Sequence, residues 1–229
     1  MRTVLVDCRF DVLDPAGGRR LYLEGHAPGA AFLDVDADLA DLSIPDAGRH
    51  PLPSAGRFAA AAGRAGISND ALVVAYGNGA GRLWWLLRHF GHETVGVVDW
   101  HGPWRRGEET IEPATFEPHE RAGDTIQADE LLSRLDDPGL SILDARAPER
   151  WRGDVEPIDP VAGRIPGALN AYPELPLPDV GGTEVAVYCG SGIAACTTLL
   201  KLHEAGVAGR LYPGSWSEWC RRGLPGETG

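Results

Sequence analysis

The sequence predicts an α/β protein built from two tandem domains, each a mostly parallel β-sheet with helices on both faces. Three short motifs recur in the same order in the two halves of the 229-residue chain, which indicates an internal repeat. Each half alternates short apolar runs with helical segments, a pattern typical of parallel strands joined by crossover helices. The polar stretch 111–118 contains two prolines and marks a boundary. We therefore expect an N-terminal domain over 1–112, a linker over 113–123 and a C-terminal domain over 124–229.

The repeat is carried by three pairs of motifs. Their common order in the two halves is hard to explain by chance, although the third pair is displaced by one residue from a strict strand match. The pairs are Val4-Leu-Val-Asp7-Cys-Arg9 with Ser141-Ile-Leu-Asp144-Ala-Arg146, Gly25-His-Ala-Pro-Gly-Ala30 with Gly163-Arg-Ile-Pro-Gly-Ala168, and Leu72-Val-Val-Ala-Tyr-Gly-Asn-Gly79 with Val185-Ala-Val-Tyr-Cys-Gly-Ser-Gly192.

In the first half, apolar runs predict strands at residues 4–7, 31–35, 72–76 and 95–98, and periodicity predicts a helix over 82–90. Residues 46–53 are rich in turn formers and predict a loop. A gapless alignment of residues 84–87 on 197–200 puts Tyr76 where Cys189 stands. Because a phenol cannot do the work of a thiol nucleophile, we expect the first domain to be catalytically silent.

In the second half, residues 128–135 predict a helix, 140–144 a strand, and 163–169 a segment leading into another strand. A proline-rich connection over 171–182 follows. The short apolar run 185–188 then predicts a buried strand, and the apolar spacing from Ile193 onward predicts a helix.

Cys189 lies between that strand and that helix and is followed by Gly190-Ser-Gly192. Glycines allow a tight turn, and a tight turn at a helix start directs backbone N–H groups and the positive end of the helix dipole toward its centre. A thiolate is stabilised there, so the setting favours Cys189 as a nucleophile over a merely buried cysteine. A Cys-dependent phosphatase would need an arginine where Ala195 stands, and no cation lies between Cys189 and Lys201.

The charge and the cysteine content indicate which binding partners and which cellular compartment to expect. The formal net charge of −12 argues against nucleic acid and anionic membranes, and an anionic substrate would need a local cationic patch. The four cysteines show no metal-ligand spacing and no disulfide density, so we expect reduced thiols, no metal or other cofactor, and a cytoplasmic location. The N-terminus predicts a strand and not a signal peptide, and no apolar run approaches the ~20 residues of a membrane span.

The motif Cys189-Gly-Ser-Gly-Ile after a strand, with Tyr212-Pro-Gly-Ser-Trp-Ser-Glu-Trp219 downstream, resembles the C-terminal half of a two-domain rhodanese. The resemblance spans nearly the whole chain. It is greatest to the 3-mercaptopyruvate sulfurtransferase subtype, whose loop reads Cys-Gly-Ser-Gly-Val-Thr, because the thiosulfate-specific subtype carries cations in that loop. It implies two rhodanese-like domains and a sulfurtransferase, with 3-mercaptopyruvate as donor, thiosulfate as second choice, and cyanide, a small thiol or a thioredoxin-like protein as acceptor. The alternative is a non-enzymatic persulfide carrier or protein-interaction module.

The resemblance also implies a substrate site. Cys189 would form the persulfide, and the loop residues Gly190, Gly192, Ile193 and Ala194 would contact the substrate. Arg150 would bind the donor's carboxylate through two parallel hydrogen bonds, unless it forms only a surface ion pair. Counting to the family's second substrate arginine lands on Asp159, and Arg152 or Arg164 are the candidates to compensate.

Similar enzymes use an Asp-His-Ser relay, which by resemblance is Asp36, His50 and Ser191 here. His50 could instead be an ordinary loop histidine. The family's loop threonine is Ala194 in this chain, which predicts a lower rate or looser donor choice. Cys196 is expected to pack in the helix, with a resolving thiol as the alternative. Trp151, Trp216 and Trp219 would either wall the pocket or pack in the core.

Overall fold

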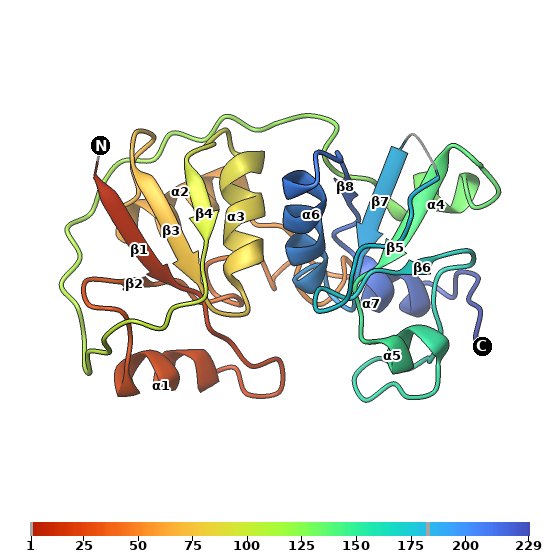
Figure 1. Cartoon of the computed structure of the whole chain (residues 1–229), viewed down its shortest axis with the longest axis horizontal. Helices are drawn as coiled ribbons and strands as arrows, with labels where there is room; N and C mark the ends of the chain where they lie inside the picture. The colour runs from red at the N-terminus through yellow and green to blue at the C-terminus, as the bar shows by residue number, and fades with distance from the viewer. Residues whose placement is uncertain (1, 182–183) are drawn as a thin grey trace. The chain divides into compact units, whose positions relative to one another are not determined.

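The computed structural model describes residues 2–181 and 184–229, so Met1 and Gly182, at the ends of two predicted segments, lie outside the described residues. The chain divides into two compact units (Figure 1). Unit 1 contains Met1–Asp41 and Leu52–Arg121, and unit 2 contains Leu42–Pro51 and Ala122–Gly229. Among the described residues, no helix is long and apolar enough to cross a membrane.

Unit 1 is a four-stranded sheet in the order β2-β1-β3-β4, and all of its strand pairs are parallel. Apolar side chains that alternate along β1 and β3 face the core. The elements are β1 (Thr3–Asp7), α1 (Gly17–Glu24), β2 (Ala31–Phe32), α2 (Ala55–Arg64), β3 (Leu72–Tyr76), α3 (Ala80–His89) and β4 (Val95–Val97).

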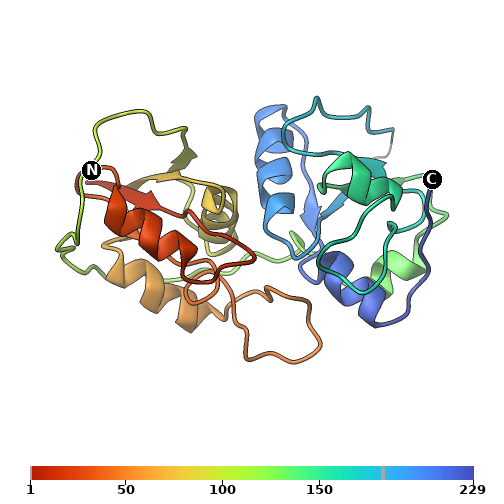
Figure 2. The same ribbon diagram turned by 90° about the horizontal axis from the view of Figure 1, so that it is seen from below.

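Unit 2 repeats this plan with a parallel sheet in the order β6-β5-β7-β8. Helix α6 packs beside β7 as α3 packs beside β3 (Figures 1 and 2). The predicted α/β class, the parallel sheets and the internal repeat are therefore confirmed. The elements are α4 (Ala128–Ser133), β5 (Leu140–Asp144), α5 (Pro148–Arg152), β6 (Leu169–Asn170), β7 (Glu184–Tyr188), α6 (Ala194–Glu204), β8 (Arg210–Leu211) and α7 (Ser215–Arg221).

Strand β2 is shorter than the predicted 31–35 and ends at Phe32. The side chain of Asp34 accepts hydrogen bonds from the backbone N–H groups of Asp36 and Ala37, both at 2.9 Å. Such local side-chain bonds stabilise a turn in competition with a strand. The chain therefore turns away from the sheet immediately after two paired residues.

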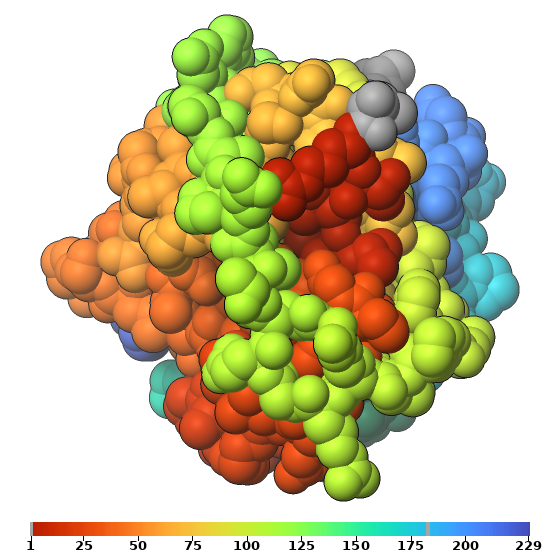
Figure 3. All heavy atoms as spheres, turned by 90° about the vertical axis from the view of Figure 1, so that its left-hand side faces the viewer, coloured from red at the N-terminus to blue at the C-terminus, as the bar shows by residue number. Residues whose placement is uncertain are grey.

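The extended chain after β4 crosses one face of unit 1 (Figure 3). It is fixed by backbone hydrogen bonds to three separate parts of the unit. Arg105 and His26 bond to each other in both directions at 2.8 Å, Ala114 N–H donates to Gly63, and His119 N–H donates to Phe90. This stretch includes most of the predicted 113–123 linker, and it packs on unit 1 up to Arg121.

The core of unit 2 is an aromatic and aliphatic cluster that contains Tyr188, Trp216 and Trp219. Trp216 donates its indole N–H to the carbonyl of Val161 at 2.8 Å, and Trp219 donates to that of Pro225 at 2.6 Å. Both indoles are buried and their polar atoms are satisfied, which agrees with the core alternative for these two residues. Trp151 is half-buried, and the Cζ atom of the Arg164 guanidinium lies over it, 4.2 Å from the centre of the Trp151 ring.

Residues 42–51 belong to unit 2, although the predicted N-terminal domain, 1–112, includes them. Gly48 has a φ of +88°, and a Cβ there would come within 2.6 Å of the carbonyl oxygen of Gly214. The next residue, Arg49, donates its backbone N–H to Ser217 Oγ at 3.0 Å. Two glycine backbones thus meet where no side chain would fit, and the segment docks beside the start of α7.

Candidate active site

The predicted nucleophile lies at the carboxyl end of β7, where the strand passes into α6. Cys189 is 3 % exposed. The backbone N–H of Gly192 donates to Cys189 Sγ at 3.1 Å. This contact depends on the tight turn, because Gly192 has a φ of +81°, which disfavours any residue with a Cβ. The predicted strand–loop–helix is confirmed, and its loop directs an N–H group at the sulfur.

Helix α7 holds the backbone of this loop. The N–H of Cys189 donates to Ser215 Oγ at 3.2 Å, and its carbonyl accepts from the N–H of Trp216 at 2.9 Å. The carbonyl of Gly190 accepts from the N–H of Ser217 at 3.0 Å. Ser215 itself has a φ of +54°, a conformation that residues with a side chain rarely adopt. The Tyr-Pro-Gly-Ser-Trp stretch therefore has a structural role that the sequence analysis did not predict. Its hydrogen bonds fix the backbone of the loop that carries the nucleophile.

The other loop residues are enclosed with Cys189. Ser191 and Ile193 are buried, and Ala194 begins α6 and is half-buried. Cys196 is fully buried and donates its S–H to the carbonyl of Gly192 at 3.2 Å. Its burial agrees with the expectation that Cys196 packs and gives no support to a resolving role.

The residues of the predicted relay fall in different units. His50 is 5 % exposed and belongs to unit 2, together with Ser191. Asp36 belongs to unit 1, where its backbone N–H takes part in the Asp34 turn. The relay itself stays a prediction.

Arg150, the predicted carboxylate-binding residue, comes from α5 and reaches the loop. A Cβ placed on Gly190 would lie 3.5 Å from both terminal nitrogens of the Arg150 guanidinium. The side chain is only 17 % exposed. Its Nη2 lies 2.6 Å from Glu156 Oε1 and 3.4 Å from Asp159 Oδ2. Arg150 is thus part of a partly buried charge cluster beside the nucleophile, and not a simple surface ion pair.

The pKa values of the two carboxylates in this cluster are shifted in opposite directions. Burial works to raise the pKa of Glu156, but hydrogen bonds from Arg150 and from the backbone N–H groups of Asp159 and Ile158 outweigh it and hold that pKa below its ordinary value. Burial, aided by the charge of Glu156, raises the pKa of Asp159 above its ordinary value despite the neighbouring arginines. Glu156 is therefore the firmly ionised partner of Arg150.

The second arginine in the cluster is Arg49, which the sequence did not single out. It forms an ion pair with Asp159. Arg152 and Arg164, the two candidates named from the sequence, are engaged elsewhere. Arg152 is 45 % exposed and pairs with Asp154, and Arg164 binds Glu227 at 2.8 Å and the carbonyl of Gly229. These contacts give no support to the expectation that either residue compensates, and it stays a prediction.

The repeated Asp-x-Arg motif has a structural function in both units. Arg146 pairs with Asp144 at 2.6 Å and donates to the carbonyl of Gly163 at 2.6 Å. Arg9 pairs with Asp7 at 2.5 Å and donates to the carbonyl of Gly25 at 2.5 Å. In each unit the ion pair therefore ties the end of the first strand to the Gly-x-x-Pro-Gly-Ala motif.

The equivalence of the two units corrects the position assigned to Tyr76. In the sheets, Asp7 is paired with Tyr76 as Asp144 is paired with Tyr188. The two tyrosine hydroxyls also accept equivalent backbone N–H groups, from Ala27 at 2.9 Å and from Ile165 at 3.0 Å. Tyr76 therefore matches Tyr188, and Gly77 stands where Cys189 stands. The gapless alignment was wrong by one residue, because it was anchored on the helix and not on the strand register.

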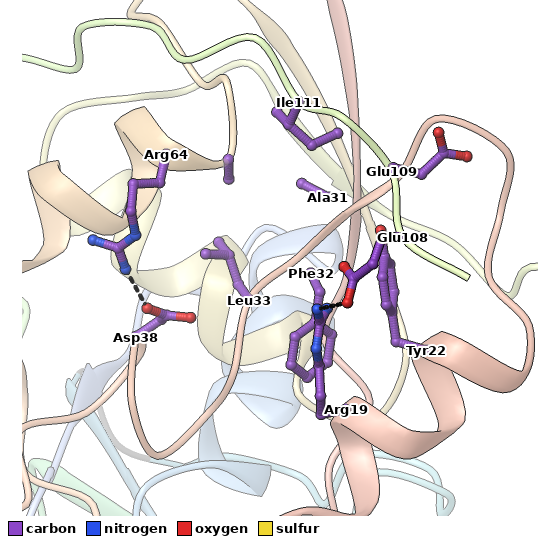
Figure 4. Close-up of a pocket in the computed structure, with 11 residues that line it drawn as sticks. Arg19, Tyr22, Ala31, Phe32, Leu33, Asp38, Arg64, Glu108, Glu109 and Ile111 are labelled. Atoms are coloured by element: carbon purple, nitrogen blue, oxygen red, sulfur yellow. Dashed lines mark hydrogen bonds and ion pairs between the residues drawn. The ribbon is translucent and has the colours of Figure 1, made fainter. Parts of the chain in front are cut away.

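A separate pocket of about 170 Å³ lies in unit 1 (Figure 4). Its polar lining includes two ion pairs, Arg64 with Asp38 at 2.6 Å and Arg19 with Glu108. The apolar part of the lining comes from Phe32 and its neighbours. No cysteine, serine or histidine is among these lining residues. The candidate site therefore remains the Cys189 loop in unit 2.

Comparisons with known proteins agree with this geometry. The rhodanese-like domain family matches residues 127–222. A putative thiosulfate sulfurtransferase, SseB, from Mycobacterium tuberculosis is 38% identical over 94% of this chain and 87% of its own length. A probable 3-mercaptopyruvate sulfurtransferase from Pseudomonas aeruginosa is 39% identical over 94% of this chain and 88% of its own length.

Among solved structures, the 3-mercaptopyruvate sulfurtransferase SseA from Escherichia coli is similar with a TM-score of 0.76 and 27% identity, covering 94% of this chain and 93% of that one. The curated relatives cover 94% of the chain, and the residues matched by the rhodanese-like family include the loop that carries Cys189. This chain therefore belongs to the rhodanese family of sulfurtransferases.

Proposed function

We propose that this sulfurtransferase takes sulfur from 3-mercaptopyruvate, holds it as a persulfide on Cys189 and passes it to a thiol acceptor or to cyanide. The observation that carries the proposal is the contact between the Gly192 N–H and Cys189 Sγ at 3.1 Å, in a loop without side-chain cations of its own. Backbone N–H groups directed at one sulfur suit a singly charged thiolate or persulfide. Arg150 beside Gly190 supplies the cation for a carboxylate on the donor.

The first half-reaction transfers the mercapto sulfur. The Cys189 thiolate attacks it, an S–S bond forms, and the C–S bond of the donor breaks with its electron pair leaving on the carbon. The resulting enolate takes a proton and becomes pyruvate, while the outer sulfur gives up its proton and remains as the persulfide anion. The proton lost by sulfur balances the one gained by carbon. We propose that Ser191, His50 and Asp36 form the proton relay.

The second half-reaction restores the enzyme. A thiolate or cyanide attacks the outer sulfur, the S–S bond breaks, and its electron pair returns to Cys189 as a thiolate. We propose a small thiol or a thioredoxin-like protein in the cytoplasm as the physiological acceptor, because each can supply that nucleophile. Cyanide serves as the assay acceptor and leaves as thiocyanate.

The deciding experiment is steady-state sulfur transfer to cyanide in the wild type and in Cys189→Ser, with 3-mercaptopyruvate and thiosulfate compared side by side. We expect turnover with 3-mercaptopyruvate that falls to background in the variant, since the serine hydroxyl cannot form a persulfide. Turnover of the wild type with neither donor would contradict the proposal and favour a persulfide carrier.

Thiosulfate is the second candidate donor. The Mycobacterium tuberculosis relative named above carries that activity in its name, and the cluster beside Gly190 contains two arginines. A dianion would use both cations. Higher kcat/KM with thiosulfate than with 3-mercaptopyruvate would establish this donor instead.

A further inference from the structure

The second residue of the repeated Gly-x-x-Pro-Gly-Ala motif is His26 in unit 1 and Arg164 in unit 2. His26 exchanges two backbone hydrogen bonds with Arg105, both at 2.8 Å. Arg164 exchanges two with Glu227, at 2.9 and 3.0 Å. In unit 1 the segment attached in this way is part of the extended chain that crosses the unit after β4, and we call residues 105–111 the strap (Figure 3).

His26 is fully buried, and each of its ring nitrogens faces an acceptor. Nδ1 lies 2.8 Å from the carbonyl oxygen of Tyr22, in the last turn of α1, and Nε2 lies 3.3 Å from Oε1 of Glu109 in the strap. The imidazole also stacks on the Tyr22 ring, with 4.0 Å between the ring centres. A carbonyl and an ionised carboxylate only accept hydrogen bonds, so both contacts are favourable only when both nitrogens carry a proton.

Glu109 is held in its ionised form. The backbone N–H of Gly29 donates to Oε1 at 2.9 Å, and this bond, aided by His26 and Arg105, holds the pKa of the Glu109 carboxyl below its ordinary value. Arginine and carboxyl groups ordinarily titrate outside the range from about pH 5.5 to 8, so the imidazole is the group whose charge changes there. The other charged side chains around the pair are Arg105 on Glu109, Arg19 over the Tyr22 ring, Glu108 on Arg19, and Arg9 on the carbonyl of Gly25.

Unit 2 has a permanent cation in the same surroundings. Arg164 donates from Nη1 to the carbonyl of Trp151 at 3.2 Å, in the last turn of α5, and its Cζ lies 4.2 Å from the centre of the Trp151 ring. Its Nε donates to Glu227 Oε1 at 2.8 Å. In both units, therefore, the carbonyl and the ring of one aromatic residue and the carboxylate of one glutamate surround a nitrogen-bearing side chain. A cation is favoured there, because the carbonyl end of a helix carries partial negative charge.

From this equivalence we infer that His26 is a buried imidazolium and that the His26–Glu109 pair is a pH-sensitive contact that holds the strap on unit 1. Loss of the proton leaves one ring nitrogen as a lone pair against an acceptor, whichever tautomer forms. The contact is therefore present below the ordinary titration range of histidine, about pH 6.5, and is lost as the pH rises through the titration of the imidazole. Because Glu108, Glu109 and Ile111 of the strap line the unit 1 pocket, loss of the contact also frees one wall of that pocket (Figure 4).

Backbone hydrogen exchange at about pH 5.5 and 8, on either side of the ordinary histidine value, tests the pair without any enzyme activity. Each rate is corrected for the intrinsic exchange of that amide. We expect the protection factors of Arg105 and Gly107, whose amides bond to unit 1, to fall about tenfold at the higher pH, the usual effect of losing a charge-assisted hydrogen bond. The amide of Glu227 is the internal control and should not change, because Arg164 keeps its charge.

Glu109→Gln should abolish this pH dependence. A glutamine amide can donate to a neutral imidazole nitrogen while its oxygen still accepts from Gly29, so the contact no longer needs the proton. Glu108→Gln is the matched control, because Glu108 lies on the same strap but pairs with Arg19 at the surface, and it should keep the tenfold change. Thermal unfolding shows whether each variant is folded. A pH dependence that persists in folded Glu109→Gln would overturn the inference.

Nitrogen NMR of the imidazole reads the protonation of His26 directly. We expect both ring nitrogens to carry protons at about pH 5.5, and the loss of one proton to follow the same pH curve as the protection of the strap. A neutral ring at the lower pH, an imidazolium that persists at the higher pH, or strap protection that changes without a change in the ring would each contradict the inference.

Discussion

At the scale of single residues, the chemistry depends on a few backbone positions around Cys189. Gly192 adopts a φ of +81° and thereby directs its N–H to the sulfur at 3.1 Å. Ser215 adopts an unfavourable φ of +54° and accepts the N–H of Cys189. Backbone strain at such positions is tolerated when the surrounding structure determines it and when the site requires it.

We predict that Gly192→Ala lowers kcat at least tenfold while reducing the free energy of unfolding by only about 1–2 kcal/mol, the usual cost of a Cβ at positive φ. The cause is loss of the turn that directs the N–H to Sγ. Steady-state assay and urea unfolding would measure both effects.

Gly206→Ala is the control for strain alone. Gly206 has a φ of +76°, and a Cβ there would have nothing within 4 Å. This variant should lose similar stability and keep its activity. Comparable activity in the two alanine variants would contradict the function assigned to the Gly192 N–H.

At the scale of elements, the site is assembled by α5, α7 and the connections beside them. Helix α5 brings Arg150 to the loop, the stretch after it brings Glu156 and Asp159, and α7 clamps the loop backbone. Glu156 also accepts backbone N–H groups from Ile158 at 3.1 Å and from Asp159 at 3.0 Å. The ionised Glu156 side chain thus holds the backbone of the connection that follows α5, and it also orients Arg150.

The lowered pKa of Glu156 predicts a specific pH dependence of stability. A carboxylate with a depressed folded-state pKa contributes stability above its unfolded pKa, here ordinarily 4.5, and loses it as the pH falls through the folded value. We therefore expect Glu156→Gln to be less stable than the wild type at pH 7, and the difference to shrink as the pH falls below about 4.5.

Urea unfolding of both proteins across pH 3.5–7, a range that spans the ordinary carboxyl value, would measure this. Glu174→Gln is a suitable control, because Glu174 is exposed and accepts a hydrogen bond from the Tyr172 hydroxyl at 3.0 Å. A difference that stays constant with pH would show that Glu156 acts through packing and not through its charge.

At the scale of the whole molecule, the chain contains two copies of one unit, and they differ at the residue that follows the third strand in sequence. Both units have the same strand order, the same Asp-x-Arg ion pair and the same buried tyrosine at the end of the third strand in sequence. The next residue is Gly77 in one unit and Cys189 in the other. A Cβ on Gly77 would lie 2.7 Å from Arg9 Cγ and 2.8 Å from Arg9 N. Unit 1 therefore has no room for a thiol at this position.

We predict that Gly77→Cys in the Cys189→Ser background restores no sulfur transfer and lowers the unfolding temperature. The new side chain would combine a φ of +93° with a clash against the Arg9 backbone. Transfer to cyanide and a thermal melt would test this. Measurable turnover would show that unit 1 retains a working loop, and an unchanged melting temperature would contradict the predicted clash.

The sequence determined the α/β class, the parallel sheets, the duplication and the strand–loop–helix that carries Cys189. These features depend on local periodicity and on residues adjacent in the chain, such as Gly190 and Gly192, so they can be predicted without contacts. The resemblance to the rhodanese family, and not the local pattern, identified Arg150 and the closing Tyr-Pro-Gly-Ser-Trp stretch, although it did not predict the hydrogen bonds by which this stretch holds the loop.

Only the tertiary structure decided which unit residues 42–51 join, which tyrosine is equivalent to which, and which second arginine stands at the loop. Arg49 meets Asp159 and Ser217 across 110 and 168 residues of chain. No spacing rule spans such distances, because a contact of that kind depends on how packed elements meet and not on the sequence near either partner. In the sequence, Asp159 stands where the family has its second substrate arginine, so a cation is missing at that position. In the folded chain, Asp159 forms an ion pair with Arg49 and holds that cation in place.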